Sequence, residues 1–254
     1  MKPQKRNDHN RTFIHGRRPI VEWLESGLAV KQILLARETA GKLPQEILRL
    51  AEKRAIPLKR LGAFQLDQLA QTDKHQGVLA EVELPPYSTV ADILARAQER
   101  NEPPLIAVLD GVQDPHNLGA VLRTADAAGL HGVVIPKDQA VGMTPAAVKT
   151  SAGAAAWMPL VQETNLARFL QEMKKAGFWV TGTAEDGDRA YHQADFKGAS
   201  IIVLGGEGKG MRRLVRESCD FVVRIPMCGQ VSSLNVSVAA GLLFFEARRQ
   251  RSKT

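Results

Sequence analysis

The chain has 254 residues, 44% of them hydrophobic and 24% charged, a composition that excludes a globally disordered protein. It contains no run of eighteen apolar residues, and its charged N-terminus has no apolar segment behind it, so we expect neither a membrane span nor a secretory signal. Two cysteines, Cys219 and Cys228, are too few for a disulfide framework or a structural zinc site, which favours a cytoplasmic protein without a metal.

The net charge of +7 is concentrated at the two ends of the chain. Residues 1–20 carry a net charge of +5 and residues 247–254 carry +4, whereas residues 21–246 hold 24 basic and 26 acidic side chains. Two flexible basic tails would suit a polyanionic partner, and RNA or DNA is the leading class. The alternative is that the tails serve only solubility.

The N-terminal third of the chain predicts a short arm followed by a small domain. Residues 1–11 are polar, basic and without periodicity, which is typical of a disordered arm. Residues 12–84 alternate short helical and strand patterns and form a first α/β domain of about seventy residues, near the lower limit for independent folding. Helices are predicted over Arg18–Ser26, Pro44–Ala55 and Gln65–Gln71, and strands over Val30–Leu35, just after Pro57, and over Gly77–Leu84, the last with the alternation of a half-buried strand.

A change of composition marks the end of this domain. Four of the thirteen prolines lie between residues 85 and 104, around a polar, helical segment, and this pattern favours a semi-rigid linker. Residues 105–254 then alternate short apolar strands with helices, which predicts a mainly parallel sheet with helices on both faces. The predicted strands are Leu105–Leu109, Gly132–Ile135, Trp157–Val161, Phe178–Thr183, Ile201–Leu204 and Phe221–Ile225, and the predicted helices Leu118–Ala128, Pro145–Ala155, Leu166–Ala176 and Met211–Ser218.

Three loops, each between a predicted strand and a helix, are the candidate ligand sites, because ligands of open α/β sheets gather at the carboxyl ends of strands. The first contains Asn117, which could cap a helix, and Arg123 about two turns further on. The second has four glycines in six positions, Gly205–Gly210, and matches neither the Walker nor the dinucleotide-binding pattern. Its glycines imply either a close backbone approach or a tight bend, and nothing local explains the carboxylate of Glu207.

The third loop leads into the last helix, which Ser233 could cap. This helix is apolar nearly all round, with Leu234, Val238, Leu242 and Phe245 along one face. We expect such a helix to be buried, either in the core of one chain or against a second subunit. The periodicity of its apolar residues does not distinguish between these two arrangements. The sequence contains no Ser–His–Asp, paired-carboxylate or metal-ligand spacing, so we expect no metal site.

Taken together, the loops carry three motifs in a fixed order: Asn117-x-Gly119-x3-Arg123, Gly205-x-Glu207-Gly208-x-Gly210, and Ile225-Pro226-Met227 with Ser233-Leu234-Asn235-Val236-Ser237. They closely resemble the signature motifs of the SpoU/TrmH family of RNA ribose 2′-O-methyltransferases, which use S-adenosylmethionine. The resemblance covers Leu105 to about Gln250, and residues 12–84 look like the L30e-like RNA-binding domain of one branch.

The resemblance implies a fold, a cofactor and a partner. The fold is an α/β methyltransferase domain with a trefoil knot at its C-terminal end, and the assembly is a homodimer that buries the last helix. Overall similarity favours the branch that methylates a guanosine of 23S rRNA; a tRNA ribose methyltransferase and a non-catalytic RNA-binding ribosome-assembly factor are the alternatives. By the same resemblance, the S-adenosylmethionine site comprises Gly205, Gly206, Glu207, Ile225, Pro226, Met227, Ser233 and Leu234.

The resemblance also implies roles for the polar motif residues. Because arginine is normally always charged, Arg123 should stabilise the developing alkoxide of the ribose or a neighbouring phosphate rather than accept its proton. Glu207 could orient that guanidinium by a bidentate pair, and Asn117, Ser233 and Asn235 complete the expected catalytic set. The candidate phosphate contacts of the first domain are Arg17, Arg18, Lys53, Arg54, Lys59 and Arg60.

Overall fold

The computed structural model describes residues 11–37 and 45–252, and the chain divides into two compact units, Met1–Pro85 and Pro86–Thr254. The arm expected over residues 1–11 lies outside the described residues apart from Arg11, which is held in an ion pair with Glu81. No described helix has both the length and the apolar character needed to cross a membrane.

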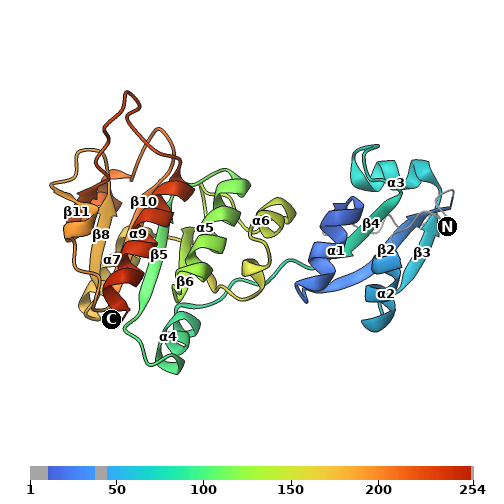
Figure 1. Ribbon diagram of the computed structural model, residues 1–254, viewed down its shortest axis with the longest axis horizontal. Coiled ribbons are helices and arrows are strands. Elements are labelled where there is room, and N and C mark those ends of the chain that lie inside the picture. The colour runs from blue at the N-terminus through green and yellow to red at the C-terminus, as the bar shows by residue number, and fades with distance from the viewer. Residues whose placement is uncertain (1–10, 38–44, 253–254) are drawn as a thin grey trace, which may run out of the picture. The chain divides into compact units, whose positions relative to one another are not determined.

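The first unit is a four-stranded sheet in the order β1-β4-β2-β3, with β4 antiparallel to β1 and β2, and with β2 parallel to β3. Helices α1 and α2 pack against each other, and α3 packs on β1, β2 and β4 (Figure 1). The strands are β1 (Thr12–His15), β2 (Val30–Ala36), β3 (Leu58–Leu61) and β4 (Val78–Val82), and the helices α1 (Arg17–Glu25), α2 (Gln45–Lys53) and α3 (Ala63–Ala70).

The central strand β4 is buried along its whole length, so the half-buried strand predicted from its alternation is wrong. Glu81, the polar residue that produced the alternation, is only 6% exposed. Hydrogen bonds to its carboxylate compensate the cost of burying this charge. Arg11 donates to its two carboxylate oxygens at 3.0 and 2.7 Å, and Gln32 Nε2 donates to it as well. The Arg11 guanidinium, bound side by side with the carboxylate, lowers the pKa of Glu81 to about 2.

The second unit is a seven-stranded sheet in the order β7-β6-β5-β10-β8-β11-β9, and all its described strand pairs are parallel. The strand expected to start at Trp157 begins only at Leu160, because Trp157 ends a short 3-10 helix over Ala154–Ala156. The strands are β5 (Leu105–Asp110), β6 (Gly132–Pro136), β7 (Leu160–Glu163), β8 (Trp179–Thr183), β9 (Arg189–Ala190), β10 (Ser200–Gly205) and β11 (Phe221–Arg224).

Helices cover both faces of this sheet, as the strand–helix alternation predicts. Successive residues of a strand point to opposite faces, and in β10 the side chains of Ile201 and Val203 join a core cluster with α4, α7 and α8. On the other face, α5 and α9 lie side by side over β5 and β10 (Figure 1). The helices are α4 (Val90–Glu99), α5 (Pro115–Ala127), α6 (Pro145–Thr150), α7 (Leu166–Lys175), α8 (Arg213–Glu217) and α9 (Val236–Arg251).

The segment expected to be a linker is largely part of the second unit. Helix α4 lies within it, and Ile93 of this helix is fully buried in the core cluster of the sheet. Tyr87 also belongs to the second unit, because its hydroxyl accepts a hydrogen bond from the backbone N–H of Met143 at 2.9 Å. The proline pairs predicted a linker, but one apolar side chain at the right helical position attaches the segment to the sheet.

The basic C-terminus is a helix end and not a flexible tail as far as the structure describes it. Helix α9 continues to Arg251, whose guanidinium donates to the carbonyl oxygens of Phe196 and Pro104. Arg248 pairs with Glu102 at 3.2 Å. Cations in the last turn of a helix stabilise its free carbonyl groups, so these charges hold the helix in place. The trefoil knot remains a prediction.

Candidate active site

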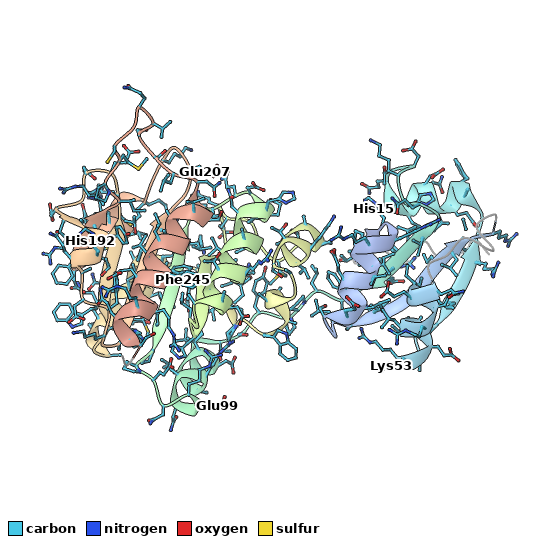
Figure 2. The ribbon with its side chains drawn as sticks, viewed as in Figure 1. His15, Lys53, Glu99, His192, Glu207 and Phe245 are labelled. Atoms are coloured by element: carbon cyan, nitrogen blue, oxygen red, sulfur yellow. The ribbon has the colours of Figure 1, made fainter. Side chains whose placement is uncertain are left out.

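The structure brings the three sequence motifs together in one hydrogen-bonded cluster. The side-chain amide of Asn117 donates to Glu207 Oε1 at 2.9 Å, across 90 residues of sequence. The amide of Asn235 donates to the same Glu207 oxygen at 2.9 Å and to Asn117 Oδ1 at 3.0 Å. We call these three residues the amide–carboxylate cluster. Figure 2 shows Glu207 in the loop beyond β10, near the start of α9.

Helix capping sets the positions of the two asparagines, although not as expected from the sequence. Helix α5 is capped by Asp114, which accepts from the N–H of His116 at 2.9 Å, so Asn117 lies in the first turn and is free to face the cluster. Helix α9 is capped by Asn235, which accepts from the N–H of Ser237 at 2.9 Å. Ser233 is exposed and does not cap the helix.

The glycines of the second motif serve both of the purposes that the sequence left open. A Cβ on Gly205 would lie 2.2 Å from the backbone of Gly210, and one on Gly206 would lie 2.4 Å from the carbonyl oxygen of Gly111. Gly208 and Gly210 have left-handed backbones, with φ of +74° and +63°. The first two glycines therefore allow a close approach and the last two make the bend that presents Glu207.

Asp110, a residue outside the three motifs, holds both ends of this loop, one through its main-chain carbonyl and the other through its buried carboxylate. The carbonyl oxygen of Asp110 accepts from the N–H of Gly206 at 2.8 Å, and its side-chain Oδ2 accepts from the N–H of Arg212 at 2.7 Å. The Asp110 side chain is completely buried. A carboxylate directly after an apolar strand and before a glycine was the signal in the sequence.

Arg123 does not meet Glu207 within one chain, and the bidentate pair between the two side chains stays a prediction for a dimer. Arg123 follows Asn117 by six residues, and at about 100° per residue the two side chains lie about 120° apart around α5. Its side chain is exposed, and no ion pair or hydrogen bond joins it to another described residue. Glu207 is held by the two asparagine amides instead.

Gly119, the other residue of the first motif, is needed for packing. A Cβ there would lie 2.4 Å from the carbonyl oxygen of Ala147 and 2.7 Å from Cβ of Thr150, which belong to helix α6. The absence of a side chain lets α5 and α6 approach closely, so the motif contains a structural position between two site residues.

The residues expected to hold a cofactor follow two strands at the carboxyl edge of the sheet. Gly205 ends β10, and the third loop starts directly after β11. Outside the strand ladders, no described backbone–backbone hydrogen bond involves residues 225–234, so their carbonyl groups, and the N–H groups of all but Pro226, remain available to a ligand. The hydroxyl oxygen of Thr183, at the end of β8 between these strands, is buried and has no partner among the described residues.

Unpaired polar groups of this kind suit a ligand bound largely through the main chain. Backbone donors and acceptors together with one hydroxyl can recognise a heterocyclic base or a small zwitterion. The described residues contain no group of three or more metal-ligating side chains.

The expected phosphate contacts of the first unit differ in whether another side chain or main-chain group already binds them. Lys53, Lys59 and Arg60 are exposed and have no ion-pair or hydrogen-bond partner among the described residues; Figure 2 labels Lys53 at the end of α2. Arg18 is exposed but pairs with Glu22 at 3.0 Å. Such a surface pair is weak and would yield readily to a phosphate.

Two of the six basic residues have a guanidinium that is bound or partly buried within the protein. Arg54 donates to three main-chain carbonyls at the end of α1, those of Leu24, Gly27 and Leu28, at 2.7 to 3.0 Å. The Nε of Arg17 is buried without a partner among the described residues. Arg54 is therefore a helix-end support, and it is not available as a phosphate contact in this conformation.

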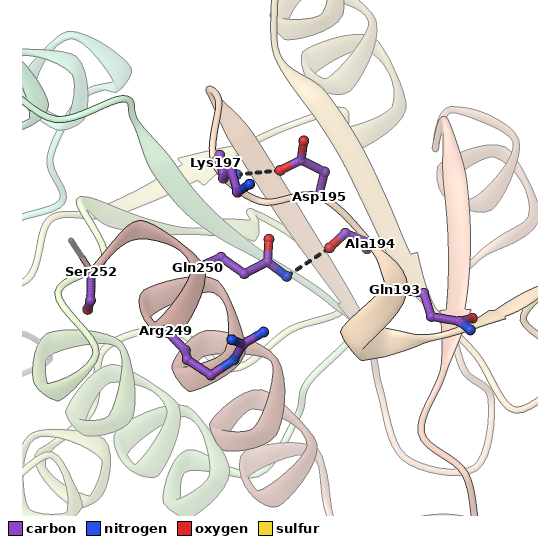
Figure 3. Close-up of a pocket in the computed structure, with 7 residues that line it drawn as sticks. All are labelled: Gln193, Ala194, Asp195, Lys197, Arg249, Gln250 and Ser252. Carbon is purple, nitrogen blue, oxygen red and sulfur yellow. Dashed lines mark hydrogen bonds between the residues drawn. The ribbon is translucent and has the colours of Figure 1, made fainter. Parts of the chain in front are cut away.

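A pocket of about 400 Å³ lies elsewhere on the second unit, beside the C-terminal end of α9 (Figure 3). Gln250 crosses it and donates to the carbonyl oxygen of Ala194 at 2.9 Å. The pocket shares no residue with the amide–carboxylate cluster. Its lining residues are Gln193, Ala194, Asp195, Lys197, Arg249, Gln250 and Ser252.

Both units match families of known proteins. Residues 104–245 match the SpoU rRNA methylase family, and residues 13–88 match the substrate-binding domain of RNA 2′-O ribose methyltransferases. The chain is 50% identical to the 23S rRNA (guanosine-2′-O-)-methyltransferase RlmB of Shewanella oneidensis, over 86% of this chain and 88% of that protein. It is 42% identical to RlmB of Vibrio vulnificus, over 94% of this chain and 95% of that protein.

Solved structures agree with the sequence relatives. The SpoU methyltransferase AviRb of Streptomyces viridochromogenes, determined in complex with AdoMet, superimposes with a TM-score of 0.74 at 27% identity, over 95% of this chain and 90% of that one. The match includes both units, and the three motifs that converge on the amide–carboxylate cluster fall within the region of the family match. The chain therefore belongs to the SpoU rRNA methylase family.

Proposed function

We propose that the protein methylates the ribose 2′-hydroxyl of a guanosine in 23S rRNA, with S-adenosylmethionine as the methyl donor. The amide–carboxylate cluster carries this proposal, because it joins residues of all three motifs at the carboxyl edge of the parallel sheet. The RlmB relatives act on a guanosine of 23S rRNA, and AviRb was determined with AdoMet.

The cofactor site of the proposal lies between the second and third loops. When bound, S-adenosylmethionine supplies a methyl group that its sulfonium already activates for transfer. The free main-chain groups of residues 225–234 and the unpaired hydroxyl of Thr183 support binding there. The glycine loop would form the other wall, with Gly205 and Gly206 packed closely against Gly210 and Gly111, and with Glu207 exposed beyond them.

The remaining task of the site is to hold the ribose hydroxyl in line and to assist loss of its proton. Glu207 Oε1 is occupied by the two asparagine amides, whereas Oε2 has no hydrogen-bond partner among the described residues. The amides thus fix the carboxylate and leave one oxygen to accept a hydrogen bond from the hydroxyl or from an arginine. A guanidinium close to the oxygen would stabilise the negative charge that develops there.

The proposal includes a homodimer that supplies this arginine. Val238, Leu242 and Phe245 form one stripe of α9 and are 52%, 36% and 53% exposed (Figure 2 labels Phe245). The opposite stripe, which includes Leu243 and Phe244, is buried within the chain. A second copy covering the exposed stripe would also cover the adjacent helix α5, and Arg123 could then reach the cluster of the other chain.

The test combines binding, assembly and product mapping. We expect the purified protein to bind S-adenosylmethionine in calorimetry, to scatter light as a dimer at micromolar concentration, and to add one ribose methyl group to 23S rRNA. Mapping ribose methylation in rRNA and tRNA from a deletion strain identifies the target in the cell. A methyl group missing only from tRNA would favour a tRNA enzyme, and cofactor binding without any methyl transfer would favour an assembly factor.

A further inference from the structure

An ion pair between a buried carboxylate and a half-exposed arginine, at the carboxyl edge of the second unit's sheet, has no part in the mechanism above. It joins Asp110, the last residue of β5, to Arg212, which follows the glycine loop. Arg212 donates to the Asp110 carboxylate twice, from its backbone N–H at 2.7 Å and from its side-chain Nε at 2.6 Å. The aspartate side chain is 0% exposed and the arginine side chain is 48% exposed.

The geometry of this pair leaves half of the guanidinium free. Arg212 binds the carboxylate through Nε alone, and its two terminal nitrogens have no hydrogen-bond or ion-pair partner within the described residues. A planar guanidinium held along one edge still presents N–H groups that can bind a phosphate or carboxylate. Asp110 thus fixes the direction of the arginine, so less side-chain entropy is lost when the free groups bind an anion.

The position of Arg212 is close to the amide–carboxylate cluster. Asp110 of β5 is paired in register with Gly205 of β10, so the ion pair lies at the same carboxyl edge as the loop that carries Glu207. The next residue, Arg213, is different because it pairs with Glu217 on the surface of α8. Of these two neighbouring arginines, only Arg212 is anchored to a buried group beside the site.

We propose that Arg212, oriented by Asp110, binds a phosphate of the RNA strand next to the target ribose. Asp110 is then a positioning residue that acts through Arg212. This inference rests on the proposed function, because it requires an RNA strand at the cluster. The carboxylate of S-adenosylmethionine is the other anion that could reach this edge, and the experiment separates the two.

The test uses the full-length protein with Arg212→Gln and, as a matched control, Arg213→Gln. Loss of one charge-assisted hydrogen bond should raise the KM for 23S rRNA about tenfold or more in Arg212→Gln. The salt dependence of RNA binding should flatten by about 0.7 to 0.9 in the log–log slope, the change expected for one phosphate contact. The Kd for S-adenosylmethionine should stay within about twofold of wild type, and Arg213→Gln should match wild type in every measurement.

Two outcomes overturn the inference while leaving the proposed function intact. A weaker S-adenosylmethionine Kd with an unchanged salt slope would assign Arg212 to the cofactor, and wild-type values throughout would make the pair purely structural. Failure of the wild-type protein to methylate RNA would instead overturn the proposed function itself.

A double-mutant cycle tests the role of Asp110. Asp110→Asn keeps the size of the side chain but removes the charge that directs Arg212, so it should raise the rRNA KM in the wild-type background. In the Arg212→Gln background the same substitution should leave the KM unchanged, because the group it orients is already gone. An equal effect in both backgrounds would show that Asp110 does not act through Arg212. If Asp110→Asn fails to fold, the Arg212→Gln measurements still decide the phosphate contact.

Discussion

The two units of the chain use charged and polar side chains in different ways. In the second unit, three polar residues from distant loops converge on one point, and each is oriented by the other two. In the first unit, no described hydrogen bond joins the candidate phosphate contacts to one another, and the ones that remain free are exposed. Convergence of this kind indicates chemistry at a defined atom, whereas separate surface cations indicate binding to an extended polyanion.

The two units also differ in the charge state of the ionisable groups that they bury. The first unit buries Glu81 as an anion and compensates it with Arg11, which lowers the pKa of Glu81 to about 2. The second unit buries His131 as a neutral ring, since burial lowers its pKa to about 4. Nδ1 of His131 accepts from the N–H of Leu105 at 2.9 Å, a hydrogen bond that requires this nitrogen to be unprotonated.

Loss of the Arg123 guanidinium should affect turnover in the second unit more than any other single substitution. Arg123→Ala should reduce turnover by roughly two to three powers of ten, the loss expected when one transition-state donor is removed. Arg123→Lys should fail as well, because an ammonium group does not reproduce the planar fork. The Kd for S-adenosylmethionine should hardly change in either variant. Arg168→Ala, an exposed arginine of α7 paired with Glu172, is the matched control. A folded Arg123→Ala dimer with wild-type turnover would remove Arg123 from the mechanism.

Acid should begin to destabilise the second unit at a higher pH than the first. A pKa of about 4 for folded His131, against 6.5 unfolded, means that the unfolded state binds the extra proton first. Its stabilisation is complete above pH 6.5 and is lost as the pH falls towards 4, by about 3 kcal/mol at 1.36 kcal/mol per pKa unit. Glu81 stabilises its unit above pH 4.5 and loses this effect only between 4.5 and 2.

Amide hydrogen exchange resolved along the chain can follow this order in both units, and tryptophan fluorescence adds a readout for the first unit. Trp23 is buried in the first unit, and the other two tryptophans, Trp157 and Trp179, are exposed residues of the second. His131→Gln should remove the dependence between pH 6.5 and 4 in the second unit only, and Glu81→Gln should act on the first unit only. Simultaneous unfolding of both units at every pH would contradict the comparison.

Separating the two units tests their division of labour. A chain that begins at Pro86 should bind S-adenosylmethionine normally and show an rRNA KM raised by about tenfold or more, because it lacks the basic surface of the first unit. A chain that begins at residue 100 should be unstable, since it loses α4 and the buried side chain of Ile93. Full activity of the shorter protein from Pro86 would show that the first unit is dispensable.

The smallest effects distinguish binding residues from structural ones within the first unit. Lys59→Gln and Arg60→Gln should each weaken rRNA binding severalfold and flatten its salt dependence, with no change in turnover. Arg54→Gln should lower the melting temperature instead, because Arg54 supports three carbonyls at the end of α1. A reversed pattern, with Arg54→Gln changing the salt slope at unchanged stability, would place the RNA on the other side of this unit.

Local patterns in the sequence predicted much of the fold and the approximate location of the site. Apolar strands alternating with helices predict a parallel sheet, and the three motif loops fall at its carboxyl edge as expected. The predictions failed where a partner distant in the sequence determined whether a residue is buried. The alternation of residues 77–84 predicted a half-buried strand, but Glu81 is buried there with Arg11 as its partner. The proline-flanked segment predicted a linker, but the side chain of Ile93 lies in the core.

The residue types of the site and their order along the chain follow from local sequence, because motif spacing and strand–helix alternation depend on near neighbours. The folded arrangement was needed to show that Asn117 and Asn235 hold Glu207, that Arg123 faces outward, and that Asp110 binds Arg212. These outcomes depend on contacts across 28 to 118 residues of sequence. No local pattern encodes such contacts, since they form only when the strands have been ordered in the sheet and the helices have been packed upon it.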